Sequence, residues 1–477
     1  MKYRLPALLL LACMVLQPAE PFRLRGYYFT FCRVQTWPLA EWKRVYDGIA
    51  ADRGNLVLLW MGGAFRSRKF PITWAYNREH LNVRSGFARE LIDYGHSRGI
   101  KTLLGFTPFS YDGVNQYTFE HPELKAVQKN GKLAKLSGIH CWGYALNPSR
   151  PEAQKFMLDY VREMFFDFYP NADGLLIESS DYAICYCPQC QGHYYEREFE
   201  FVKKISEEVW SAKRDAMVLV YPHYFSGSTV PGFGISAARL PFDARWALFF
   251  TPHSAHLDPD LIRKAKTTIY WDSSGALGTP EKIREGAAAA RKHGLSGYVP
   301  SLEGFSFPVD HPEGGEQFLL GSRLKPFGFS WLPDGKQPYQ ELLPRVNRFA
   351  YRAFTQDPDL PFEDFKRRLG AEILGSAATP EATSDLLFLQ ESFFLDRSWF
   401  TPSPLVSPGL LKGKLEMGVL STGQLTDYNM RQDRIEKIAA AYSGRSGGPG
   451  EMGRVAQWIT DNWKANRKLL SDHLRPE

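Results

Sequence analysis

The sequence predicts an α/β fold, a (β/α)₈ TIM barrel followed by a C-terminal helical region, and three observations lead to this prediction. Eight apolar runs recur within the first 302 residues, most of them are separated by segments with helical patterning, and strand signals nearly vanish after residue 330. Near-continuous apolar runs suit parallel strands that are covered on both faces. Eight alternating βα units favour a closed barrel over an open, doubly wound sheet.

The barrel units are defined by their strands and by the helices between them. Residues 156–165 place apolar side chains at the spacing of one helical face. Thr279 and Pro280 suit the first positions of a helix, and Gly294 suits its end. The predicted strands cover residues 27–31, 55–62, 101–107, 174–179, 217–224, 246–252, 267–272 and 297–302.

The C-terminal third has a different organisation. Helical patterns cover residues 339–354, 362–369, 380–396, 427–442 and 451–470. The stretch SGRSGGPG at residues 443–450 predicts a flexible break, and PSPLVSP at 402–408 predicts an ordered loop. We therefore expect a barrel domain over residues 24–330 and a helical region over residues 331–477.

The N-terminus resembles an export signal. Lys2 and Arg4 precede an apolar run at residues 5–16, which is too short to span a bilayer, and Ala19 is a candidate cleavage position. We expect residues 1–19 to be a signal peptide. Cys13 stands in a weak lipoprotein-like sequence and offers a lipid anchor as the alternative. We therefore expect a periplasmic or extracellular protein without a transmembrane segment.

Composition excludes several function classes. The chain of 477 residues is 44% hydrophobic and 23% charged, which is enough apolar material for a large core. The net charge of +6 is too dilute for a nucleic-acid interface, and no basic run is present. Phosphate-binding and dinucleotide-binding fingerprints are missing, so catalysis should need no cofactor. The 14% of aromatic residues suits a surface that stacks on sugar rings, or simply a large core.

Acidic residues follow the fourth, seventh and eighth predicted strands. The active site of such a barrel forms at the C-terminal strand ends, where Glu178, Asp272 and Glu303 stand. Glycoside hydrolysis needs two carboxyl groups across the scissile bond. Glu178 is the expected acid, because its apolar surroundings should raise its pKa. Asp272 is slightly favoured over Glu303 as its partner, and Asp181 is a third candidate or an orienting group. Pairing with barrel Arg or Lys side chains is the non-catalytic alternative.

Aromatic and hydrogen-bonding side chains near the same strand ends are candidates for substrate binding. Tryptophans could stack on sugar rings and histidines could bond sugar hydroxyls, whereas core packing is the equal alternative. The candidates are Trp60, Trp142, Asn147, Tyr182, His223, His253 and Trp271.

A cysteine motif follows the fourth predicted strand. Cys185, Cys187 and Cys190 form C-x-C-x-x-C, a spacing that can place three thiolates around one structural zinc ion. Disulfides are the alternative in an exported protein. Either linkage would fix the loop at the barrel mouth.

The fourth ligand of such a zinc site has three candidates. Cys141 and His140 stand in the preceding loop, and His193 follows the motif. Cys141 is the preferred choice, because neighbouring βα loops come close together. Cys32 stands apart and has no evident mate.

Four stretches carry a family resemblance. LNPSRPE at 146–152 and DGLLIESSDY at 173–182, followed by the cysteine motif, resemble bacterial glycoside-hydrolase-like barrel proteins that are distantly similar to family 20 hexosaminidases and family 67 α-glucuronidases. FAYRAF at 349–354 and DPDLP at 357–361 resemble the helical tail of such proteins. The resemblance implies a barrel with a catalytic acid at Glu178. It departs from true hexosaminidases, whose adjacent Asp-Glu pair is absent, since Ile177 precedes Glu178.

These observations predict an exported hydrolase that cleaves glycosidic bonds of a poly- or oligosaccharide. A non-catalytic carbohydrate-binding barrel is the first alternative, and it would need no pair of carboxylates. A metal-dependent hydrolase is the second. Such barrels commonly carry His-x-His at the end of the first strand, where this chain has Phe29-Thr30-Phe31-Cys32-Arg33.

Overall fold

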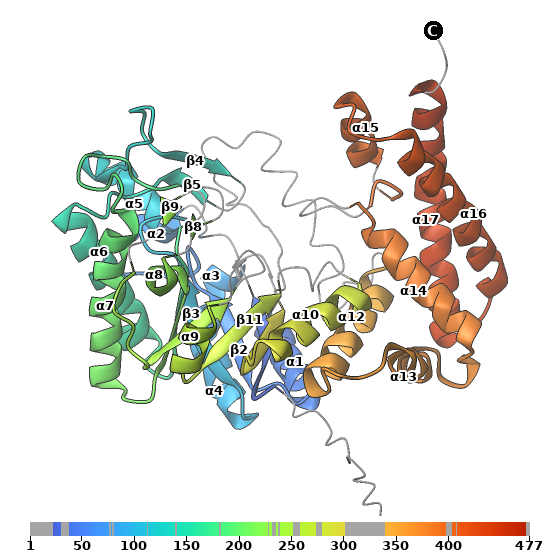
Figure 1. Cartoon of the computed structure of the whole chain (residues 1–477), viewed down its shortest axis with the longest axis horizontal. Helices are drawn as coiled ribbons and strands as arrows, with labels where there is room; N and C mark the ends of the chain where they lie inside the picture. The colour runs from blue at the N-terminus through green and yellow to red at the C-terminus, as the bar shows by residue number, and fades with distance from the viewer. Residues whose placement is uncertain are drawn as a thin grey trace, which may run out of the picture.

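A closed barrel of parallel strands forms the first part of the molecule (Figure 1). The computed structural model describes residues 22–29, 38–75, 78, 81–111, 113–138, 141–180, 183–227, 229–230, 235–236, 239–250, 258–272, 279–300, 339–396, 403–406 and 408–473. The strand order around the barrel is β1-β12-β11-β10-β7-β6-β3-β2, so the eight predicted strands and the TIM-barrel class are confirmed. The strands are β1 (Leu24–Phe29), β2 (Leu56–Trp60), β3 (Lys101–Phe106), β6 (Gly174–Ile177), β7 (Met217–Val220), β10 (Trp246–Phe250), β11 (Thr268–Asp272) and β12 (Gly297–Pro300).

The barrel closes because its first and last strands pair in parallel, with Leu24 opposite Gly297. Strand β6 pairs with β3 on one side and with β7 on the other. Its first residue is a glycine for a steric reason, since a Cβ on Gly174 would lie 1.8 Å from the carbonyl oxygen of Met217. A larger residue at this position would push β7 away.

Helices cover the outside of the barrel, as expected for alternating βα units. In α1 the apolar face is formed by Trp42, Val45, Tyr46 and Ile49, all buried. Helix α9 begins where the Asp258 carboxylate accepts hydrogen bonds from the first free backbone N–H groups. The helices of this part are α1 (Leu39–Ala51), α2 (Ile72–Ala75), α3 (Leu81–Ser85), α4 (Ala88–Ser97), α5 (Val114–Glu120), η1 (Pro122–Leu124), α6 (Pro151–Arg162) with a π-helical extension η2 (Glu163–Phe168), α7 (Tyr194–Ala212), α8 (His223–Ser226), α9 (Pro259–Lys264) and α10 (Pro280–Lys292).

Two antiparallel hairpins decorate the barrel, and the sequence did not predict them. One consists of β4 (Lys135–Gly138) and β5 (Cys141–Tyr144), and the other of β8 (Thr229–Val230) and β9 (Ile235–Ser236). Both are inserted between a strand and the following barrel unit, so they interrupt the regular βα alternation.

The C-terminal region is helical, as predicted, and stands at the side of the molecule away from α6 and α7 (Figure 1). Its longest helices, α16 and α17, pack along each other. The elements are α12 (Tyr339–Gln356), α13 (Phe362–Leu374), η4 (Gly375–Ala377), α14 (Pro380–Phe394), α15 (Pro408–Glu416), α16 (Thr422–Tyr442) and α17 (Gly447–His473). The expected boundary near residue 330 lies outside the described residues.

The structure differs from the expectations for this region at three places. The predicted break at 443–450 is shorter, because α17 already begins at Gly447 and includes Pro449 within its first turn, where the missing N–H costs nothing. Helix α15 was not predicted, although its first residue, Pro408, is a favoured helix-starting residue. At the start of α16, Ser421 and Gln424 form a capping box, which explains why this helix begins five residues before the predicted start.

Helix α12 connects the helical region to the barrel. It packs on α10, and its arginines reach the barrel residue Asp52. The guanidinium of Arg348 lies 2.5 Å from the Asp52 carboxylate, and that of Arg352 lies 3.3 Å from it. Asp52 is buried, whereas the side chains of Arg348 and Arg352 stay 35% and 31% exposed, so these ion pairs lie at the edge of the contact between α12 and the barrel.

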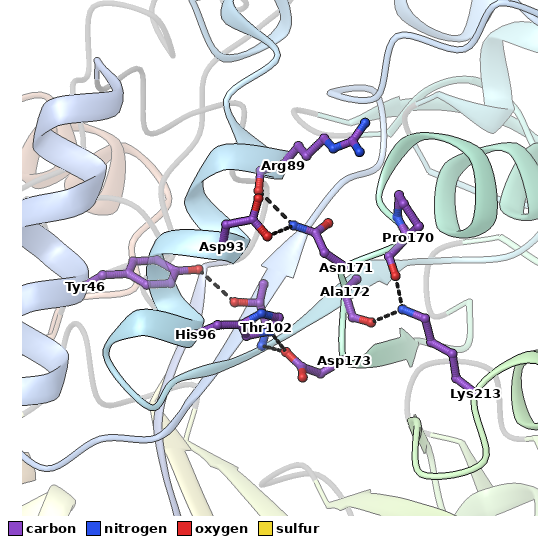
Figure 2. Close-up of polar contacts among 10 residues, drawn as sticks. All are labelled: Tyr46, Arg89, Asp93, His96, Thr102, Pro170, Asn171, Ala172, Asp173 and Lys213. Atoms are coloured by element: carbon purple, nitrogen blue, oxygen red, sulfur yellow. Dashed lines mark hydrogen bonds and ion pairs between the residues drawn. The ribbon is translucent and has the colours of Figure 1, made fainter.

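A network of hydrogen bonds links the N-terminal ends of the neighbouring strands β3 and β6 (Figure 2). Oδ2 of Asp173 accepts hydrogen bonds from the backbone N–H of Thr102 at 2.7 Å and from Nε2 of His96 at 2.9 Å. Nζ of Lys213 donates to the carbonyl of Ala172 at 2.8 Å and also to that of Pro170. This end of a TIM barrel serves stability rather than catalysis.

No helix in the described part of the chain is both long and apolar enough to cross a bilayer. The predicted signal peptide at 1–19, and Cys13 within it, lie outside the described residues.

Candidate functional site

Glu178 stands at the C-terminal end of β6 and points into the barrel. Its backbone N–H continues the sheet by donating to the carbonyl of Phe106 at 3.0 Å. Its Oε1 accepts a 2.7 Å hydrogen bond from the hydroxyl of Tyr28. Strands β1 and β6 are not neighbours, so the two side chains can meet only in the interior. Glu178 keeps 8% of its surface exposed, whereas Tyr28 is fully buried.

A row of three aromatic side chains lies beside this pair; we call Tyr221, Phe249 and Trp271 the aromatic row. Phe249 stacks on Trp271 with ring centroids 5.7 Å apart and on Tyr221 at 5.9 Å. The ring of Tyr28 meets both Phe249 and Trp271 edge-on at 5.9 Å. Tyr221 and Trp271 are partly exposed. Nε1 of Trp271 is buried without a hydrogen-bond partner among the described residues.

Asp272, the favoured partner carboxylate, lies elsewhere. Its Oδ2 accepts hydrogen bonds from the hydroxyls of Tyr298 at 2.5 Å and Tyr351 at 3.4 Å. Tyr351 belongs to α12, and the Tyr298 hydroxyl also reaches a carbonyl of α10. Asp272 therefore faces the helix layer outside the barrel, and the structure does not bring it together with Glu178. Successive strand side chains alternate between faces, and the adjacent Trp271 occupies the inner face.

Two other candidates are packed in the interior. Trp60 is fully buried, and its ring meets that of Tyr111 edge-on at 5.8 Å. His223 is buried against the rings of Tyr195 and Tyr224. Burial lowers the pKa of His223 to about 3, so its imidazole is neutral at physiological pH. The full burial of Trp60 favours a packing role. His223, being neutral, has no positive charge with which to bind a substrate.

Glu198 is a buried carboxyl that the sequence analysis missed. It lies on α7 and accepts hydrogen bonds from the hydroxyls of Ser179 and Tyr224, and more weakly from the backbone N–H of Ser180 at 3.4 Å. Burial raises the pKa of Glu198 to about 7. Ser179 and Ser180 directly follow Glu178, so Glu198 holds the segment that carries the candidate acid. The signal was present, because Glu198 interrupts the apolar face of α7 one helical turn after Tyr194.

The three cysteines of the C-x-C-x-x-C motif come together in the loop after β6. They are free thiols, and their sulfur atoms all lie within 4.8 Å of one another. The interaction between the side chains of Cys185 and Cys190 lowers the pKa of Cys185 and raises that of Cys190. The three residues therefore stay candidates for a metal site, with disulfides as the alternative.

Asn147 belongs to this cluster. Its Nδ2 donates to the sulfur of Cys187 at 3.3 Å, and its Oδ1 accepts from the thiol of Cys190 at 3.2 Å. The hydroxyl of Ser149 lies 3.5 Å from the sulfur of Cys187. Both groups of the Asn147 amide are thus engaged with thiols, which argues against its expected role in substrate binding.

His193, a candidate for the fourth metal ligand, is turned away from the cluster. Its side chain is 68% exposed, and its Nδ1 lies 3.7 Å from the carboxylate of Glu196. The backbone of Cys141 lies in β5. Its place in a metal site stays a prediction, because its side chain is outside the described part of the chain.

The remaining site candidates lie outside the described residues or have undescribed side chains, so their roles stay predictions. The side chain of Trp142 is undescribed, like that of Cys141. The residues outside the description are His140, Asp181, Tyr182, His253 and Glu303.

Comparison of the sequence with protein-family models and with curated proteins finds no match. Among solved structures, the chain is similar to a GH138 enzyme targeting pectin rhamnogalacturonan II, with a TM-score of 0.54 and 12% identity over 94% of this chain. This chain spans 57% of the length of that enzyme.

Two further structures show lower similarity. One is an O-GlcNAc hydrolase of Thermobaculum terrenum, with a TM-score of 0.46 and 11% identity over 95% of this chain and 86% of that one. The other is a chitobiase of Flavobacterium johnsoniae, with a TM-score of 0.43 and 12% identity over 96% and 74% of the two chains. At these identities the likeness is one of fold, and the similarity to the GH138 enzyme confirms the expected resemblance to a glycoside-hydrolase barrel.

Proposed function

We propose that the protein is a glycoside hydrolase in which Glu178 donates the proton to the leaving group. One observation carries this proposal: the carboxyl of Glu178 lies at the C-terminal end of a barrel strand, faces inward, and is held by Tyr28 beside the aromatic row. Active sites of TIM barrels form at this end, and a carboxyl group next to flat apolar rings suits a sugar substrate. The similarity of fold to the GH138 enzyme is consistent with this proposal.

The proposed chemistry assigns a role to each group. Glu178, held by the hydrogen bond from Tyr28, would transfer its proton to the glycosidic oxygen as the bond breaks. A second carboxylate must attack the sugar or activate water. Glu303 and Asp181 are the proposed candidates, since Asp272 bonds Tyr298 and Tyr351 outside the barrel. The reaction needs no cofactor.

The proposed substrate is a poly- or oligosaccharide. The partly exposed faces of Tyr221 and Trp271 could stack on sugar rings, and the buried Trp271 N–H could donate to a hydroxyl. We further propose that the protein is exported through residues 1–19, which supports a role in breaking down extracellular or periplasmic glycans.

The test compares wild-type protein with Glu178→Gln on a panel of oligosaccharides and polysaccharides that includes rhamnogalacturonan II. We expect the variant to lose turnover about a hundredfold or more while its glycan binding is unchanged. Glu207→Gln is the matched control, because Glu207 is an exposed residue of α7. Full activity of Glu178→Gln would contradict the assignment. Glycan binding without any turnover by the wild type would favour the carbohydrate-binding alternative.

A further inference from the structure

The cysteine cluster has the composition and dimensions of a metal site. Tetrahedral zinc holds thiolate sulfurs at about 2.3 Å, which places them roughly 3.8 Å from one another. The sulfurs of Cys185, Cys187 and Cys190 already lie within 4.8 Å of one another, so small side-chain rotations would bring them to that geometry. We propose that these three residues bind one zinc ion as thiolates, at a structural site separate from the proposed glycosidase chemistry.

The surroundings of two of the sulfurs suit negative charge. The backbone N–H of Cys187 points to the sulfur of Cys185 at 3.5 Å, and Nδ2 of Asn147 points to the sulfur of Cys187 at 3.3 Å. Oδ1 of Asn147 also accepts from the N–H and hydroxyl of Ser149, so it keeps donors when Cys190 loses its proton. Hydrogen bonds to ligand sulfurs are the usual second layer of a zinc–thiolate site.

Thiolate ligands and burial favour zinc over a redox role. Soft thiolates select zinc among the abundant divalent cations, and zinc itself does not change oxidation state. Cys185 and Cys190 are almost fully buried, and only Cys187 is partly exposed. Binding would release the three thiol protons to solvent and would involve no oxidation.

The position of the cluster indicates what the metal would stabilise. The cluster lies in the segment between β6 and α7, which starts at Glu178 and whose described residues, 178–180 and 183–193, form neither helix nor strand. This segment contacts the loop before the β4–β5 hairpin, where the N–H of Tyr186 donates to the carbonyl of Val127 at 2.7 Å. A zinc ion would crosslink the segment and fix it against Asn147 and Ser149.

The experiment measures metal directly, so its outcome is independent of catalytic activity. Full-length protein purified without chelator is analysed for zinc by mass spectrometry, and we expect one zinc ion per chain. Replacement by Co²⁺ should give an intense near-ultraviolet absorption band from sulfur-to-cobalt charge transfer. Chelation should lower the melting temperature, and added Zn²⁺ should restore it.

Cysteine variants identify the ligands. Cys185→Ser, Cys187→Ser and Cys190→Ser should each lose the zinc, whereas Cys32→Ser, which removes a thiol outside the motif, should retain it. Metal-free wild-type protein that gives no cobalt band would overturn the proposal, as would a disulfide within the motif found by peptide mapping. These two measurements on the wild type remain decisive if a variant fails to fold.

Discussion

The hydroxyl of Tyr28 donates a 2.7 Å hydrogen bond to Oε1 of Glu178 across the interior of the barrel. The two residues stand on strands that are not neighbours, so the bond fixes the carboxyl relative to a second, independent part of the sheet. The ring of Tyr28 itself packs edge-on against both Phe249 and Trp271, which leaves it little freedom. A general acid can transfer its proton only if its carboxyl group lies within hydrogen-bonding reach of the substrate, whatever its pKa. The bond from Tyr28 fixes where the carboxyl group of Glu178 lies.

Tyr28→Phe should lower kcat about tenfold and change KM little, because one hydrogen bond that orients the acid is worth about 1.4 kcal/mol. The phenyl ring would keep its contacts with Phe249 and Trp271. Steady-state kinetics on a substrate found in the glycan panel provides the measurement. Tyr27→Phe is the matched control, because Tyr27 faces Tyr351 of α12 on the outside of the barrel. Equal kcat values for Tyr28→Phe and wild type would exclude the positioning role.

Trp271→Ala should weaken substrate binding, since it removes the end of the aromatic row and the buried indole N–H. Loss of a stacking contact of about 1 kcal/mol corresponds to roughly a fivefold rise in KM. Trp271→Phe would keep the ring and lose only the N–H, so it should have a smaller effect. Titration calorimetry with the Glu178→Gln protein measures binding without turnover. Unchanged affinity in Trp271→Ala would place the substrate elsewhere.

The barrel was predictable because buried parallel strands leave a strong signal in sequence. All eight strands appeared as apolar runs, and Glu178 stood out as a carboxyl directly after one of them. The direction of Asp272 could also have been inferred. Neighbouring strand residues face opposite sides, so Trp271 and Asp272 could not both point into the barrel.

Long-range partners were not predictable from one sequence. Tyr28 and Glu178 are 150 residues apart, and no local pattern links them. Glu198 left only a weak signal, a charged residue on the apolar face of α7. The β4–β5 hairpin was missed because strands of four residues are too short to show a clear alternation of apolar and polar residues. The cysteine motif was found because its three cysteines lie close together in the sequence, whereas the hydrogen bonds between Asn147 and these cysteines depend on the fold.

Asp272→Asn should reduce stability and leave kcat nearly unchanged. The carboxylate accepts hydrogen bonds from two buried tyrosines, and the amide would leave one of these contacts poorly satisfied at a cost of about 1–2 kcal/mol. Urea denaturation together with kcat of the folded protein separates the two effects. Tyr351→Phe removes one of the two donors and should destabilise less. A hundredfold loss of kcat at unchanged stability would instead return Asp272 to the catalytic pair.

Glu198→Gln should change how stability depends on pH. The folded-state pKa of about 7 lies above the ordinary value of 4.5. Between these two pH values the folded protein therefore keeps a proton that the unfolded chain has released. The stabilisation is therefore fully present below about pH 4.5 and is lost as pH rises through about 7, on the order of 3 kcal/mol in total. Urea midpoints at about pH 5 and about pH 8 measure the loss, which Glu198→Gln should remove and the exposed Glu207→Gln should keep. If wild type and Glu198→Gln lose equal stability over this interval, Glu198 is not the titrating group, and its carboxyl must then be ionised against Ser179 and Tyr224 throughout.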